Sequence, residues 1–77
     1  MNRGSPSITL ARIHLAESLT AQRKYGEAEM VLQAAYKDAN EVQGAQHWRT
    51  KLAASELVKF YDAWGKPELA ANYRALL

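Results

Sequence analysis

The sequence of 77 residues contains no cysteine. Without cysteine, neither a disulfide nor a thiolate metal site can stabilise the fold, and this composition fits a reducing compartment. No apolar run approaches the roughly 18 residues that a membrane-spanning helix needs. The opening stretch MNRGSPS has no apolar segment behind Arg3 and therefore lacks the pattern of a secretory signal. We expect a cytoplasmic protein that does not enter a membrane.

An excess of one charge is also missing. Ten Lys and Arg residues face eight Asp and Glu residues, which gives a net charge of +2. This balance is too even to indicate nucleic-acid binding by electrostatics alone. The two signs alternate along the chain without a long run of either, which is typical of solvated helix surfaces.

Glycine and proline are scarce, with four and two residues, and they stand at breaks between apolar-periodic segments. Apolar residues recur at spacings of three and four, which predicts helices over residues 6–22, 26–41, 48–64 and 67–77. No alternating segment predicts a strand. Gly44 favours a break between the second and third helices, but one helix running across Glu41–Trp48 remains the alternative, because a single glycine costs a helix only about 1 kcal/mol.

A chain of this length forms one small domain whose core is marginal. We place this domain at residues 6–77 and interpret residues 1–5 as a disordered leader or an artificial remnant. Ala28 and Ala35 lie on the apolar face of the second helix. Small residues there predict that neighbouring helices pack closely against it.

The chain repeats itself at an offset of 42 residues. This offset aligns Leu10 with Leu52, Leu15 with Leu57, and Ala28 with Ala70. The matched positions are small and apolar, as expected where helices touch. They divide the domain into two helix–turn–helix units, at about 6–41 and 48–77.

The residues that carry a family resemblance lie on both units. They are Leu15, Ala16, Leu19, Tyr25, Ala28, Leu32 and Ala35 in the first unit, and Leu57, Tyr61, Gly65, Pro67 and Ala70 in the second. This pattern resembles the tetratricopeptide repeat. Its period exceeds the usual 34 residues and is similar to the kinesin-light-chain type, whose loop often reads Gly-x-x-His-Pro-x-Thr, where this chain has GAQHWRT. The chain also resembles the C-terminal repeat tails of bacterial multidomain proteins, including Ser/Thr kinases.

The resemblance implies an all-α fold of four antiparallel helices, which form a fragment of a right-handed solenoid. The chain departs from the family at three positions. Arg23 replaces the usual turn glycine of the first unit, Val58 stands where a smaller residue is commoner, and Arg74 replaces a large apolar residue of the last helix.

Residue patterns typical of enzymes are missing. His14 and Glu17 lie one helical turn apart and offer two metal ligands, whereas a zinc site needs three or four. The serines lie in no known nucleophile motif, and the glycines form no phosphate-binding loop. We therefore expect no catalysis, no cofactor and no metal.

The resemblance implies a concave groove lined by the first helix of each unit. The corresponding groove residues are Leu10, Ile13, Glu17, Thr20, Leu52, Ser55, Lys59 and Asp62. Family members that bind acidic chaperone tails use Lys, Asn and Arg at such positions. Ile13 and Glu17 occupy two of them in this chain, so an acidic C-terminal peptide is not the expected ligand.

Two units are fewer than such stacks usually need, which leaves apolar faces free at both ends. A homodimer would bury them. The candidate self-association residues are Trp48, Trp64, Tyr73, Leu76 and Leu77.

The favoured function is a non-catalytic protein-interaction module or scaffold that binds a peptide or helix in the groove, or another copy of itself. One alternative is a structural cap of a larger repeat array or kinase tail. Another is weak single-stranded nucleic-acid binding through the aromatic and basic residues of 48–51 and 59–66.

Overall fold

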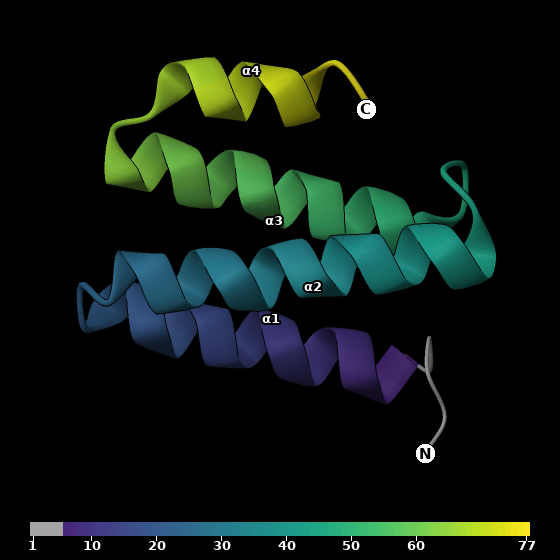
Figure 1. Ribbon diagram of the computed structural model, residues 1–77, viewed down its shortest axis with the longest axis horizontal. Coiled ribbons are helices and arrows are strands. Elements are labelled where there is room, and N and C mark those ends of the chain that lie inside the picture. The colour runs from purple at the N-terminus through teal and green to yellow at the C-terminus, as the bar shows by residue number, and fades with distance from the viewer. Residues whose placement is uncertain (1–5) are drawn as a thin grey trace.

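The computed structural model describes residues 6–77, with side chains from Thr9 onward, so the expected leader at 1–5 lies outside the described residues. The described chain is all-α and contains no strand. Its helices are α1 (Pro6–Ala21), α2 (Tyr25–Gln43), α3 (Trp48–Trp64) and α4 (Pro67–Arg74). Successive helices run antiparallel and lie side by side in chain order (Figure 1). The Cα trace extends over 31 × 26 × 13 Å, so the molecule is flat.

The predicted helices all form, with one substantial difference in their bounds. The third helix matches the prediction, and the second extends from residue 25 to 43 instead of 26 to 41. The prediction that the last helix continues to Leu77 is wrong, because α4 ends at Arg74. Leu76 and Leu77 instead donate their N–H groups to the carbonyls three residues before them, at 3.0 and 3.1 Å. Such tighter bonds commonly satisfy the last carbonyls of a helix.

The segment between α2 and α3 is a loop, which decides the alternative that the sequence left open. Gly44 ends α2 at φ 89°, in the left-handed region that glycine adopts without strain. Thr50 is buried and donates its hydroxyl to the Gly44 carbonyl at 2.7 Å. His47 caps α3, because its Nδ1 accepts the Arg49 N–H at 3.2 Å. The chain therefore forms two helical hairpins, α1–α2 and α3–α4.

The centre of the fold is α2, which contacts α1 on one side and α3 on the other (Figure 1). Its buried residues are Ala28, Leu32, Ala35 and Ala39, of which three are alanines. Alanine at a contact lets two helix backbones approach, so the prediction made from Ala28 and Ala35 agrees with their complete burial. The large core side chains come mainly from α3, including Leu57, Phe60 and Tyr61.

Each hairpin also carries an arginine–aspartate ion pair between its own two helices. Arg12 of α1 meets Asp38 of α2 at 2.6 Å, and the Arg12 guanidinium also reaches the Ala34 carbonyl at 3.3 Å. Arg74 of α4 meets Asp62 of α3 at 3.0 Å, at a more exposed place. The more exposed pair contributes only about 0–1 kcal/mol, so it fixes helix orientation more than it stabilises the domain.

The turns within the two hairpins have the same hydrogen bonds at the 42-residue offset. After α1, Lys24 N–H donates to the Leu19 carbonyl at 2.8 Å. After α3, Lys66 N–H donates to the Tyr61 carbonyl, also at 2.8 Å. Both turns are Schellman motifs, which need one residue in the left-handed conformation. Gly65 supplies it at φ 78°, but Arg23 does so at φ 63°.

The strained residue of the first turn generates a stability prediction. A side chain in the left-handed region costs about 1–2 kcal/mol, and the gain from removing it is partly offset by the greater flexibility of glycine in the unfolded chain. We expect Arg23→Gly to raise the free energy of unfolding by about 0.5–1 kcal/mol. We expect Gly65→Arg to lower it by about 1 kcal/mol, since nothing lies within 4 Å to clash with an added Cβ. Urea denaturation of both variants measures these changes.

The control for this comparison is Lys24→Gly. Lys24 has a φ of −91°, where glycine relieves no strain. A gain in stability from Lys24→Gly equal to that from Arg23→Gly would contradict the explanation.

Candidate functional site

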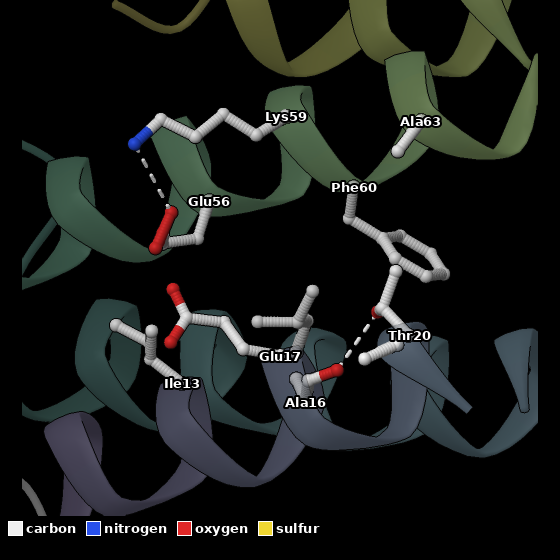
Figure 2. Close-up of a pocket in the computed structure, with 10 residues that line it drawn as sticks. Ile13, Ala16, Glu17, Thr20, Glu56, Lys59, Phe60 and Ala63 are labelled. Carbon is white, nitrogen blue, oxygen red and sulfur yellow. Dashed lines mark hydrogen bonds and ion pairs between the residues drawn. The ribbon is translucent and has the colours of Figure 1, made fainter. Parts of the chain in front are cut away.

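An apolar pocket of about 350 Å³ opens between α1 and α3 (Figure 2). Helix α1 contributes five of its residues, α3 contributes four and α2 contributes one. They are Ile13, Ala16, Glu17, Thr20, Ala21, Leu32, Glu56, Lys59, Phe60 and Ala63. The volume lies at the small end of the range of ligand pockets, about 300–1,000 Å³.

The deep part of the pocket belongs to the hydrophobic core. Ile13, Leu32 and Phe60 are all buried members of the core cluster. Ala16 is buried, Ala21 and Ala63 are exposed, and all three are too small to fill the space. The Thr20 hydroxyl is already paired, because it donates to the Ala16 carbonyl at 2.8 Å. This part of the pocket therefore presents mainly hydrocarbon.

The rim of the pocket is charged. The carboxylates of Glu17 and Glu56 extend toward the same end of the view as the Lys59 ammonium, and Phe60 lies toward the other end (Figure 2). Lys59 Nζ lies 3.6 Å from Glu56 Oε2. The Glu17 carboxylate also lies 3.5 Å from His14 Nδ1 on the exposed surface of α1. Among the described residues no three potential metal-ligating side chains come together.

Four of the eight residues predicted for the groove line this pocket: Ile13, Glu17, Thr20 and Lys59. The other four do not. Leu10 is exposed, and Leu52 is half-buried against the core. Ser55 is half-buried outside the pocket, and Asp62 is paired with Arg74 of α4.

On α3 the pocket is lined by Lys59 and by three residues that were not among the predicted groove positions, for a geometric reason. The resemblance assigned equivalent groove positions to the first helix of each unit, and equivalent positions of two similar units point in the same direction. A pocket between two helices is lined by the sides that face each other, which are not equivalent. On α3 the lining residues Glu56, Phe60 and Ala63 follow the predicted Ser55, Lys59 and Asp62 by one position, a rotation of about 100°. The sequence did contain a signal for these residues. Ala16, Ala21 and Ala63 are small side chains that line the same pocket as Phe60 and leave space beside its ring.

The candidate self-association residues divide into two groups. Trp64 and Tyr73 are half-buried, and their rings pack against other rings of the same molecule. Trp64 stacks on Tyr25 with ring centroids 5.4 Å apart, and Tyr73 stacks on Tyr61 at 5.9 Å. Exposed large apolar side chains remain at Trp48, Leu76 and Leu77.

The aromatic and basic segments that suggested nucleic-acid binding are also engaged within the molecule. The Arg49 guanidinium lies 5.3 Å from the Trp48 ring centroid, and the Lys66 ammonium lies 4.8 Å from that of Trp64. Phe60 and Tyr61 are buried. Of the aromatic residues in these segments, Trp48 is the one with a large exposed surface, which is little for stacking successive bases.

The outer side of α1 differs from the matching side of α3. Leu57 is completely buried, whereas its counterpart Leu15 is 51% exposed. Ala53 is completely buried, whereas its counterpart Ala11 is exposed. This side of α3 packs within the domain, and the equivalent side of α1 faces solvent.

A polar cluster between α2 and α3 surrounds the buried Tyr61 hydroxyl. This hydroxyl donates to Glu29 Oε2 at 2.8 Å and accepts from Gln33 Nε2 at 3.0 Å. Burial raises the pKa of Tyr61 well above its ordinary value, and the hydrogen bond to Glu29 raises it further. Burial also raises the pKa of Tyr73, which lies beside Tyr61.

Comparison of the chain with protein-family models, curated proteins and solved structures found no match. The resemblance to tetratricopeptide repeats therefore depends on the residue pattern of this chain alone. Within residues 6–77, no helix combines the length and the apolar character that crossing a membrane requires.

The Tyr61 cluster predicts how stability depends on pH. A raised folded-state pKa contributes stability that is complete below the unfolded-state value of about 10 and is lost as the pH rises toward the folded-state value. We expect the free energy of unfolding to fall above about pH 10, and to fall less steeply in Tyr61→Phe. At pH 7 the same variant should lose about 1–2 kcal/mol, because Glu29 and Gln33 lose their partner.

Urea denaturation between about pH 7 and pH 11 checks this prediction. Tyr25→Phe is the control for removing a hydroxyl, because the Tyr25 ring packs against Trp64 at the turn of the first hairpin. Equal slopes for wild type and Tyr61→Phe above about pH 10 would contradict the assignment.

Proposed function

We propose that this chain is a non-catalytic protein-interaction module that receives an apolar side chain of a peptide or helix in the pocket between α1 and α3. The observation that carries the proposal is the pocket itself, because it is a preformed apolar cavity inside a domain too small to leave much core volume unfilled. Apolar pockets with a few polar groups at the rim are the usual form of binding sites.

The resemblance to tetratricopeptide repeats supports the same function. The two hairpins share their turn hydrogen bonds and a completely buried alanine, Ala28 or Ala70, at the 42-residue offset. The pocket lies between the first helices of the two units, where the family places its groove. From this resemblance we also propose that the four helices form a fragment of a right-handed solenoid and that the protein is cytoplasmic.

Blocking the pocket tests the proposal. Ala63 lines the pocket but is itself exposed, so Ala63→Phe fills the cavity without disturbing the core. The control is Ala71→Phe, which adds the same ring to an exposed alanine on α4 outside the pocket. We expect peptides selected by wild type from a displayed library to bind Ala71→Phe normally and to lose at least about tenfold in affinity for Ala63→Phe.

Circular dichroism and urea denaturation establish that both variants remain folded. The proposal fails if the library yields no binder, or if the selected peptides bind Ala63→Phe as well as wild type.

The exposure of Leu15 favours a second candidate function, in which the domain stacks on another helix through the outer side of α1, as a self-associating scaffold or as the cap of a larger array. Complete burial of one leucine side chain contributes about 1.5–3 kcal/mol, which is a substantial part of the binding free energy of a small interface.

Self-association through α1 makes its own prediction. We expect the average molar mass of wild type in light scattering to rise with concentration above 8.6 kDa, and Leu15→Glu to remain monomeric. Leu15 is half exposed, so the substitution should leave the fold intact. If wild type stays monomeric throughout the concentration series, self-association through α1 is excluded.

A further inference from the structure

The charges at the rim of the pocket indicate which partner it accepts. We propose that the pocket selects a segment of a partner protein that places one large apolar side chain in the cavity and a lysine or arginine against Glu17 and Glu56. This inference rests on the proposed function, because it names the chemistry of the ligand for the same site.

Glu56 is the first part of the argument. Its side chain is only 12% exposed, although it carries a carboxylate at the edge of an apolar pocket. The ion pair with Lys59 leaves 3.6 Å between Nζ and Oε2, which is longer than a hydrogen bond. The Lys59 side chain is 77% exposed, so water solvates and screens its charge. A carboxylate on a largely buried side chain, with only this distant partner, gains from a closer donor.

Glu17 adds a second carboxylate to the same rim. Its side chain is 62% exposed and lies near His14, which balances its charge only when protonated. With His14 neutral, the two glutamates and Lys59 give the rim a net negative charge, whereas the whole chain has a net charge of +2. The charged residues of the rim therefore have a net charge opposite in sign to that of the whole protein.

The two parts of the pocket together define the ligand. The walls at Ile13 and Phe60 favour an apolar side chain, and the rim favours a cation. Lysine and arginine suit this combination, because their aliphatic stems can lie along an apolar wall while the charged group reaches a carboxylate. An acidic ligand would instead place like charges beside Glu56, which costs affinity and provides specificity.

The test uses a library of helical peptides with a central Leu, Met or Phe. The positions three and four residues on either side of that anchor are randomised among Lys, Gln and Glu. The library is selected on the full chain, and the affinities of three matched peptides that differ only in these residues are measured by fluorescence anisotropy. We expect enrichment of Lys, and about tenfold tighter binding of the Lys peptide than of its Glu counterpart at physiological salt.

Three variants assign the preference to the rim. We expect Glu56→Gln to weaken the Lys peptide about tenfold and to leave the Gln peptide nearly unchanged. Glu17→Gln, at an exposed position that cannot endanger the fold, should weaken the Lys peptide about threefold. Glu68→Gln removes an equivalent charge from α4, outside the pocket, and should change neither affinity.

The outcomes separate the two proposals. If anchored peptides bind wild type but not Ala63→Phe, and Gln or Glu serves as well as Lys, the preference for a basic partner is overturned while the proposed function stands. If no anchored peptide binds, the proposed function itself fails. If wild type is a dimer and Ala63→Phe is a monomer, a second copy fills the pocket and the partner assignment is overturned.

Discussion

The close approach of α2 to both of its neighbours is the constraint on which the rest of the structure depends. Three of the four buried residues of α2 are alanines, and the helix packs between α1 and α3. Small side chains let helix backbones approach, and large side chains from the facing helix then fill the remaining space. Leu57, Phe60 and Tyr61 perform this second role from α3. The first helices of the two hairpins are thereby brought near enough to share a pocket.

The sequence predicted the helices well, because the physical signals for them are local. Pro6 and Pro67 suit first helical positions, and Gly44 and Gly65 stand at the ends of α2 and α3, so the breaks could be placed to within two residues. The C-terminal end of α4 was misplaced. The apolar pattern continues through Leu76 and Leu77, and a pattern of hydrophobicity carries no information about where the last carbonyls find donors.

The site was predicted only in part, because it depends on how two helices face each other. Ile13, Glu17, Thr20 and Lys59 line the pocket and were predicted from the resemblance. Glu56, Phe60 and Ala63 were missed because their role follows from the rotation of α3 about its axis relative to α1, which a one-residue shift changes by about 100°. Leu32 of α2 also lines the pocket. It was not predicted, because the predicted groove positions came only from the first helix of each unit.

The lining of the pocket has a thermodynamic consequence. Its walls come from α1 and α2 of the first hairpin and from α3 of the second. A molecule bound there would bridge the two hairpins and would be released when they separate, so its binding would be linked to folding. Ligand at about a hundred times its dissociation constant would stabilise the folded state by about 2.7 kcal/mol. For a domain of this size that corresponds to a rise of roughly 10–20 °C in the unfolding temperature. The thermal midpoint of this protein would therefore serve as an assay for any ligand of this pocket.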